Sequence, residues 1–213
     1  MKTVKFPGLA DQKAFVRPLA VSDLESCLEV ESAFPEQERC SKEKVSYQQY
    51  QKIFVPRFAD KHQFIYRLTV CPEICLGLFE ERSQGDQLIG HVIATRVSAN
   101  RVTDGSMEMP ERWTGSSDTV TVDDQVIGND AKGRFLGVHS LAIRSEYQGM
   151  GLGRALMNEY ILYAGQSIES AQSIVIIAHD HLIKFYESFG FKNLGPSPCA
   201  FGGGGWYDME LGI

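Results

Sequence analysis

The chain runs Gly137-Val138-His139-Ser140-Leu141-Ala142-Ile143-Arg144-Ser145-Glu146-Tyr147-Gln148-Gly149-Met150-Gly151-Leu152-Gly153-Arg154-Ala155-Leu156 through its most informative stretch. An apolar, extended run with one histidine ends in a polar turn, passes three glycines at alternate positions and enters a segment with helical spacing. Glycines leave backbone N–H groups open to an anion, and a helix N-terminus adds roughly half a positive charge. The stretch therefore predicts a strand, a pyrophosphate-binding loop and a helix, with Arg154 adding a full positive charge.

Size and composition indicate one soluble domain. The 213 residues are enough for a single sizeable core, so we expect one domain over residues 1–213. The contents of 43% apolar and 23% charged residues are those of an ordinary globular protein. No segment approaches the roughly 20 apolar residues of a membrane span, and no apolar stretch of signal-peptide length follows the N-terminus. We therefore expect a cytoplasmic protein with no membrane partner.

Charge and cysteine usage narrow the classes of partner. A formal net charge of −6 argues against nucleic acid as the main partner, since that role needs a basic face. The charge permits a cationic substrate, although an acidic surface kept for solubility explains it equally well. Of the five cysteines, only Cys71 and Cys75 are close in sequence, and no second pair completes a zinc set. We expect free or structural thiols and no metal.

The segments before the quoted stretch predict a mixed helix and strand order. A first edge strand is expected at residues 14–19, followed by helices at 22–34 and 41–54. Three strands of a β-meander are then expected, at residues 64–70, 74–80 and 88–97. The polar residues 99–134 interrupt the pattern. We interpret them as an inserted flap or a partly mobile hairpin, because a stretch so long and polar is either functional or loosely held.

The segments after it predict a parallel pair of strands. A helix is expected at residues 155–168 and a strand apolar on both faces at 173–178. Strand, helix and strand over residues 135–178 form a right-handed crossover unit, which makes the two strands parallel. A short helix at 182–189 and two final strands complete the chain.

Two other phosphate-binding motifs fit the glycines poorly. Gly149, Gly151 and Gly153 do not have the G-x-G-x-x-G spacing, and no acidic residue ends a strand about 20 residues later. No Gly-Lys-Ser/Thr follows, so the loop is not a P-loop. Taken alone, the glycines would also suit a simple turn between strand and helix.

The loop does not stand alone. Gln148-x-x-Gly151-x-Gly153 at the mouth of a helix, followed by a strand and by Phe185-Tyr186-Glu187-Ser188-Phe189-Gly190-Phe191, resembles the GNAT N-acetyltransferase superfamily. The resemblance implies an α/β (α+β) fold whose mixed, mostly antiparallel sheet has six to seven strands, a central parallel splayed pair and about four helices. It also implies acetyl-CoA as cosubstrate, with its pyrophosphate on the glycine loop and Tyr186 beside the thioester sulfur.

A narrower resemblance points to the arylalkylamine (serotonin) N-acetyltransferase branch. Residues 68–80, with Cys71-Pro72-Glu73, resemble a segment of that branch, and Val138–Ile143 resembles its catalytic strand. The likeness covers most of residues 15–211 apart from the insertion, and a fungal polyamine acetyltransferase of the same branch would look much like this chain. That strand carries His-x-His in the vertebrate enzymes. Here Gly137 replaces the first histidine, which puts a two-histidine proton relay in doubt.

The chemistry of amine acetylation assigns roles to two side chains. An alkylamine has a pKa near 10, so only on the order of one molecule in a thousand is uncharged at neutral pH. His139 is the expected general base, directly or through water, and a buried structural histidine is the alternative. Tyr186 is the expected acid for the departing thiolate, and an aromatic that merely packs the helix is the alternative. Backbone N–H groups over Leu141–Ile143 are the expected oxyanion donors.

The remaining site residues surround the cosubstrate and the amine. Pantetheine is expected along Leu141, Ala142 and Ile143, in the manner of an added strand. The pyrophosphate is expected on Gln148, Gly149, Met150, Gly151, Leu152, Gly153 and Arg154. Asp180 lines the cofactor channel or belongs to an ordinary turn. By the resemblance, Phe34 and the loop to Ser41, together with Leu141, form the amine site, with Phe34 as a plain core residue equally credible.

These expectations amount to an acetyl-CoA-dependent N-acetyltransferase that acts on a small primary amine by direct attack in a ternary complex. The supply of aromatic residues favours an arylalkylamine acceptor, and the acidic charge favours a polyamine. Two alternatives stay open: acetylation of a protein N-terminus or lysine, and a non-catalytic acyl-CoA-binding module. No obligate protein partner is evident.

Overall fold

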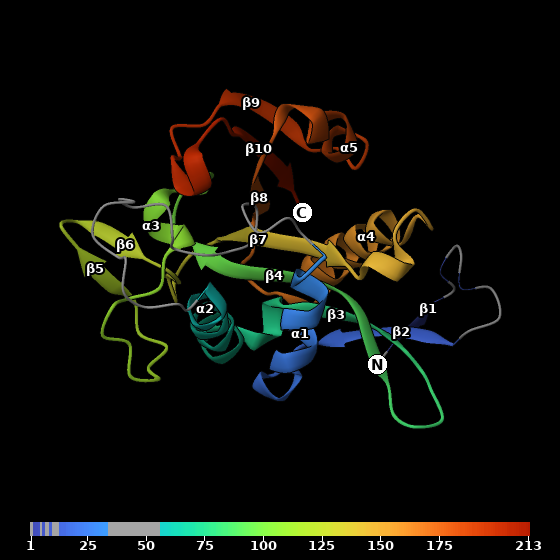
Figure 1. Ribbon diagram of the computed structural model, residues 1–213. Coiled ribbons are helices and arrows are strands. Elements are labelled where there is room, and N and C mark those ends of the chain that lie inside the picture. The colour runs from blue at the N-terminus through green and yellow to red at the C-terminus, as the bar shows by residue number, and fades with distance from the viewer. Residues whose placement is uncertain (1, 5, 7–8, 10–12, 34–55) are drawn as a thin grey trace.

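An eight-stranded sheet with helices on both faces forms the centre of the protein (Figure 1). The computed structural model describes residues 2–4, 6, 9, 13–33 and 56–213, so Phe34, the loop to Ser41 and the helix expected at 41–54 lie outside the described residues. The strand order is β1-β2-β3-β4-β7-β8-β10-β9, antiparallel except between β7 and β8. This confirms the expected fold class, with one strand more than the sequence predicts.

The elements have the following bounds. The strands of this sheet are β1 (Lys2–Val4), β2 (Ala14–Pro18), β3 (Leu76–Glu80), β4 (Gln87–Val97), β7 (Phe135–Ile143), β8 (Ser173–Ala178), β9 (Lys192–Pro196) and β10 (Tyr207–Gly212). A separate hairpin consists of β5 (Val120–Val122) and β6 (Gln125–Ile127). The α-helices in the described residues are α1 (Leu24–Glu31), α2 (Pro56–Val70), α3 (Asp104–Met107), α4 (Leu152–Ser167) and α5 (Ile183–Glu187).

The predicted parallel pair is present and it splays apart. β7 and β8 pair from Phe135 with Ser173 to Val138 with Ile176, and α4 makes the crossover between them. Beyond Val138, β7 has no partner on β8, although β4 still pairs with its other edge. The end of β7 thus keeps one backbone edge available to a ligand.

Two core clusters divide the molecule at the sheet. On one face, α4 packs Leu156 and Tyr160 against the sheet residues Leu136 and Val138. On the other face, α1 and α2 cover the sheet through a second cluster that includes Ala142 of β7. A third, smaller cluster joins Val97, Val102, Met107, Val175 and Cys199 at the far end of β4.

Residues 64–70 form the last part of helix α2, so the strand expected there is wrong. Phe64, Arg67 and Leu68 are buried at helical spacing, and Thr69, which follows them, is exposed. A short apolar run fits either period, and burial against β4 and α1 decides for the helix. At the N-terminus, β1 pairs with β2, so the strand at residues 14–18 is not at the edge of the sheet.

The insertion at residues 99–134 contains α3 and the β5–β6 hairpin. Its hairpin turn uses Asp123 and Asp124 at positive φ of 48° and 60°, the conformation that a two-residue turn of this kind needs. The insertion is anchored to α2, because the Asn129 N–H donates to the hydroxyl of Tyr66 at 2.8 Å. Trp113 also packs edge-on against the Tyr66 ring.

The remaining expectations concern thiols, metal and membrane. The four described cysteines are buried and free. Among the residues that the structure describes, no group of three or more His, Cys, Asp or Glu side chains could hold a metal ion. No described helix has the length and apolar character needed to cross a membrane.

Candidate active site

The glycine loop leads into α4 with its backbone exposed. Gly149 and Gly151 have φ of 77° and 75°, in the left-handed region that glycine favours. A Cβ on either residue would meet no atom within 4 Å, so backbone conformation rather than crowding requires glycine there. No side chain caps the N-terminus of α4, whose first residue is Leu152. An uncapped helix start of this kind is suited to bind an anion.

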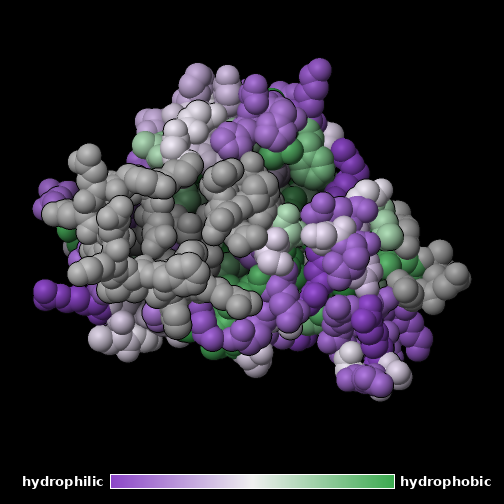
Figure 2. All heavy atoms as spheres, in the orientation of Figure 1, coloured by the Kyte–Doolittle hydropathy of each residue, from purple (hydrophilic) through white to green (hydrophobic). Residues whose placement is uncertain are grey.

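A cavity of about 420 Å³ joins this loop to the splayed end of β7. It also borders α5, and Figure 2 shows apolar residues gathered between α5 and α4. Its lining contains residues expected to bind the cosubstrate or to act in catalysis: Leu141, Ala142, Ile143, Gln148, Gly149, Gly151, Leu152, Gly153, Arg154 and Tyr186. The sequence did not single out the other lining residues, Ala33, Tyr147, Leu182 and Phe185.

Other expected site residues do not line this cavity. Met150 points outward with 41% of its surface exposed. The side chain of Asp180 is 82% exposed, and its Oδ1 accepts a hydrogen bond from the N–H of His181 at 2.7 Å. His139 lies two residues before Leu141 on β7, outside the lining.

Two polar side chains, Gln148 of the loop and Arg154 of α4, connect the elements that border the cavity. The Gln148 side-chain amide donates to the carbonyl of Ile143 at 3.0 Å, which fastens the loop to the end of β7. Arg154 donates to Ser188 Oγ at 2.6 Å and lies over the ring of Phe189, which ties α4 to α5. Both side chains border the cavity while making these contacts.

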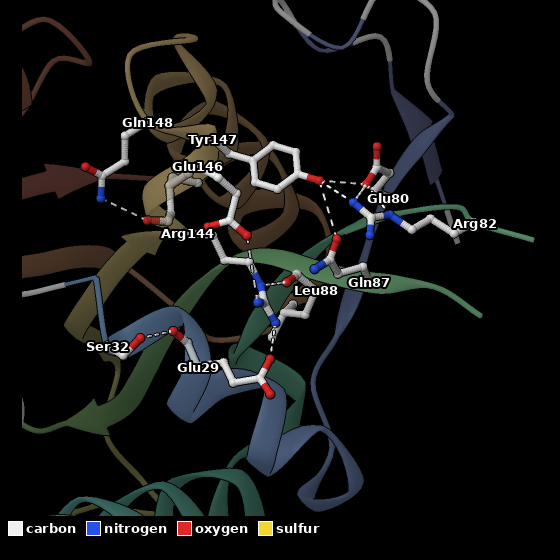
Figure 3. A network of polar contacts seen from close by, with 11 residues as sticks. Glu29, Ser32, Glu80, Arg82, Gln87, Leu88, Arg144, Glu146, Tyr147 and Gln148 are labelled. Carbon is white, nitrogen blue, oxygen red and sulfur yellow. Dashed lines mark hydrogen bonds and ion pairs between the residues drawn. The ribbon is translucent and has the colours of Figure 1, made fainter. Parts of the chain in front are cut away.

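A polar network on the side of the sheet fixes the turn that precedes the glycines (Figure 3). Arg144 forms an ion pair with Glu29 of α1 and donates from Nε to the Leu88 carbonyl at 2.6 Å. The Tyr147 hydroxyl donates to Glu80 at 2.8 Å and accepts from Arg82 at 2.6 Å. The turn is therefore held before any ligand binds, and its partners, 56 or more residues away in sequence, could not be found from local patterns.

His139 has its imidazole held on both nitrogens. Nε2 lies 2.7 Å from the hydroxyl of Thr95 on β4, and Nδ1 lies 3.1 Å from the sulfur of Met107 on α3. A thioether sulfur only accepts hydrogen bonds, so the tautomer that fits carries its proton on Nδ1. Nε2 is then the basic nitrogen, and it accepts from the Thr95 hydroxyl.

The surroundings keep His139 uncharged. Desolvation lowers its pKa well below the usual 6.5, and the nearby positive charge of Arg67 lowers the pKa further. Arg67 reaches the same region from α2, where its Nη2 donates to the Met107 carbonyl at 3.0 Å. At neutral pH the imidazole is therefore a neutral base.

Tyr186 lies in an apolar setting on α5. Its ring packs edge-on against Phe185 and Phe191. Desolvation raises the pKa of its hydroxyl to about 12, so the proton stays on the oxygen at neutral pH. A thiolate in the same apolar setting is destabilised in the same way, which offsets the weaker acidity of the phenol.

The chain was compared with known protein families, curated proteins and solved structures. Residues 84–213 match the acetyltransferase (GNAT) domain family. The chain belongs to the GNAT acetyltransferase family. The match covers β4, the splayed pair, the glycine loop and α5, and it includes every residue that lines the cavity except Ala33.

Curated relatives of this GNAT chain include serotonin N-acetyltransferases. The protein from Mesocricetus auratus is 33% identical over 144 residues, covering 68% of this chain and 57% of the hamster protein. The human protein is 30% identical over 144 residues, covering 68% and 57%. The chain thus matches little more than half the length of these relatives.

Among solved structures, the loading GNATL domain of CurA from Lyngbya majuscula superposes with a TM-score of 0.60 at 15% identity, covering 92% of this chain and 96% of that domain. Identity at this level demonstrates a shared fold and nothing more.

Gly137 of this GNAT chain, where the resemblance described above implies a histidine, lies in a packed position. A Cβ on Gly137 would lie 3.1 Å from Cγ1 of Val97, so a larger side chain would have to displace that valine. Val97 belongs to the apolar cluster with Met107 and Val175, and Val175 pairs with Gly137 across the sheet. Apolar packing therefore occupies the space next to Gly137, and β7 brings the single histidine, His139.

A second buried polar cluster lies beside His139, and the sequence did not reveal it. Ser140 donates to Glu31 Oε2 at 2.8 Å, and His91 Nε2 lies 3.1 Å from that oxygen and 3.2 Å from Ser140 Oγ. All three side chains are buried. The cluster joins the end of α1 to β4 and β7, and so connects the strand of the candidate base to the helix that ends at residue 31.

Proposed function

We propose that the protein is an acetyl-CoA-dependent N-acetyltransferase that acetylates a small primary amine by direct attack in a ternary complex. One observation carries the proposal: a single cavity joins the uncapped N-terminus of α4, the free edge of β7 and the hydroxyl-bearing Tyr186. An anion site, a strand edge and a half-buried proton donor are the parts that binding and cleavage of an acyl thioester need.

The residues present fit the proposed cosubstrate. The loop from Gln148 to Arg154 offers backbone N–H groups and a guanidinium for a pyrophosphate, without a competing cap. The edge of Leu141–Ile143 that β8 leaves unpaired offers backbone groups for an extended amide chain. When bound, acetyl-CoA supplies an acetyl group activated as a thioester.

His139 is the proposed base for the acceptor amine. Its Nε2 accepts from Thr95, so a proton from the amine reaches the imidazole through that hydroxyl or through water. Desolvation and Arg67 keep the imidazole neutral and able to take the proton. The same surroundings disfavour a charged ammonium, which selects the uncharged amine that can attack.

Tyr186 is the proposed acid. Its pKa of about 12 keeps the proton on the hydroxyl until a thiolate develops in the same apolar setting. Unpaired backbone N–H groups at the end of β7 are the proposed donors to the oxyanion of the tetrahedral intermediate. The names of the serotonin N-acetyltransferase relatives support an arylalkylamine as the acceptor.

The test is release of free CoA from acetyl-CoA with a panel of tryptamine, phenylethylamine, spermidine and a lysine peptide. We expect turnover with small amines, and loss of about a hundredfold in kcat or more for His139→Ala and Tyr186→Phe, with CoA binding retained. His62→Ala, at an exposed position of α2, and Tyr163→Phe, at a half-buried position of α4 outside the cavity lining, are matched controls. Activity on the peptide alone would overturn the small-amine acceptor, and full activity of both site variants would overturn the assigned roles.

A further inference from the structure

Helix α2 carries two buried polar side chains with unmade hydrogen bonds, and one of them, Arg67, acts on the charge of His139. Gln63 is 2% exposed, and neither its amide oxygen nor its amide nitrogen has a hydrogen-bond partner among the described residues. Arg67 is 1% exposed, and its Nη1 likewise has no partner in the described part of the chain. Buried polar groups are almost always paired, so two such groups on one helix indicate that a ligand completes them.

The two side chains occupy one face of α2, and Arg67 connects that face to the candidate base. They are four residues apart, which places them one helical turn from each other. Arg67 donates to the carbonyl of Met107, and the sulfur of Met107 lies 3.1 Å from Nδ1 of His139. One residue therefore separates the guanidinium from the imidazole that receives the amine proton.

A carboxyl group and a guanidinium group both lie near the strand of His139. Next to His139, the Ser140 hydroxyl donates to the carboxyl group of Glu31. Met107 of α3 contacts both the imidazole of His139 and the guanidinium of Arg67. A guanidinium has only donors, so its free N–H requires an acceptor atom, and a neighbouring amide offers both a donor and an acceptor. A second positive charge close to Arg67 would be repelled in this buried setting.

We propose that Gln63 and Arg67 are specificity residues that bind a hydrogen-bond-accepting oxygen at the end of the acceptor far from its amine. This rests on the acetyltransferase function proposed above, and it chooses between the acceptor classes. An arylalkylamine with an oxygen on its ring satisfies both side chains. A polyamine brings a second ammonium group against Arg67 and leaves the guanidinium without an acceptor.

The test is a series of acceptors that differ only at the far end of the ring: phenylethylamine, tyramine and 4-(2-aminoethyl)benzoate, with spermidine as the dicationic or tricationic case. In the wild type we expect kcat/KM for an oxygen-bearing acceptor to exceed that for phenylethylamine by about tenfold or more, mainly through KM. Comparison of tyramine with the benzoate distinguishes a hydroxyl from a carboxylate as the oxygen that is recognised.

Two variants carry the test. Arg67→Met and Gln63→Met should each bring the ratio of tyramine or benzoate to phenylethylamine towards one, and Arg67→Met should raise the relative rate with spermidine. Arg134→Met, at an exposed position, is the matched control and should keep the wild-type ratios. Should Arg67→Met not fold, Gln63→Met decides the question through the same ratio, because it removes no charge.

The outcomes separate this proposal from the function on which it rests. A wild-type ratio near one, or a ratio unchanged in variants whose melting temperature and CoA affinity match the wild type, overturns the specificity role while the acetyltransferase stands. An equal loss of activity with all acceptors also overturns it, since a structural role predicts that result. No turnover by the wild type with any amine overturns the proposed function, and the specificity role with it.

Discussion

His139 and Ser140 are adjacent in β7, and a β-bulge turns both side chains toward the same face of the sheet. Ile93 of β4 pairs with Ser140 and the next residue, Ala94, pairs with Val138, which leaves His139 as the extra residue. His139 accordingly contacts α3, and Ser140 contacts α1. In a regular strand one of the two would face α4. The bulge thus places the candidate base and the contact with Glu31 side by side.

The hydroxyl of Thr95 is expected to matter for turnover because it donates to the basic nitrogen of His139. Thr95→Val keeps the shape of the side chain and removes that hydrogen bond. We expect kcat to fall by about tenfold or more with little change in CoA affinity. Steady-state kinetics with a saturating amine measure the effect, and Thr121→Val in the exposed β5 strand is the control. An unchanged kcat would show that the proton does not pass through Thr95.

The buried cluster beside His139 should contribute to stability. Ser140→Ala removes a hydroxyl that donates to the carboxyl group of Glu31 at 2.8 Å, in a site closed to water. The free energy of unfolding should fall by about 1–3 kcal/mol, the usual cost of weakening a buried polar pair. Urea unfolding measures the change. Ser167→Ala, at an exposed position of α4, should lie within about 0.5 kcal/mol of the wild type. Equal stability of the two variants would contradict the prediction.

The charge of Arg67 should be visible in the titration of His139. Burial and then Arg67 lower the pKa of the imidazole below 6.5, so the positive charge opposes protonation. Arg67→Met removes one of the two causes, and the pKa of His139 should rise towards 6.5 without reaching it. NMR titration of the imidazole nitrogens measures both values, and a His139→Gln variant identifies the signals. The same midpoint in both proteins would show that desolvation alone sets the pKa.

The lowered pKa of His139, and its expected rise in Arg67→Met, should both be visible in the pH dependence of kcat/KM. Because the wild-type imidazole is neutral down to a pH well below 6.5, His139 should produce no loss of activity between pH 8 and 6.5. In Arg67→Met the loss that comes from protonation of the base should begin at a higher pH. An acidic limb at pH 6.5 in the wild type, present with amines of different pKa, would contradict a strongly lowered pKa for the base.

The sequence predicted the parts of the fold that local patterns encode. The helix after the glycines, the buried strand at residues 173–178 and the parallel arrangement of the pair all agree with the structure. Glycines at fixed spacing and an apolar run on both faces are signals within one element. Residues 64–70 show the limit of such signals, because a seven-residue stretch rich in apolar and β-branched side chains suits a strand as well as the end of a buried helix.

What the sequence could not predict depends on contacts between distant segments. The bulge at His139 arises from the pairing register between β7 and β4, and no local sequence pattern predicts it. Ser140 and Glu31 are 109 residues apart, and Arg67 meets Met107 across 40 residues. Such pairs form only when the sheet has assembled, so the candidate base could be named from a motif while its neighbours could not.

Substitution of Gly151 should weaken CoA binding in addition to lowering the free energy of unfolding. Gly151 and Gly205 have almost the same φ, 75° and 78°. A Cβ on either residue would meet no atom within 4 Å. Alanine at each position should therefore lower the free energy of unfolding by about 1–2 kcal/mol through the left-handed conformation alone. Only Gly151→Ala disturbs the residue that precedes the first turn of α4. Calorimetric titration should show about tenfold weaker CoA binding for Gly151→Ala and wild-type affinity for Gly205→Ala. Equal affinities would mean that the loop backbone does not hold the pyrophosphate.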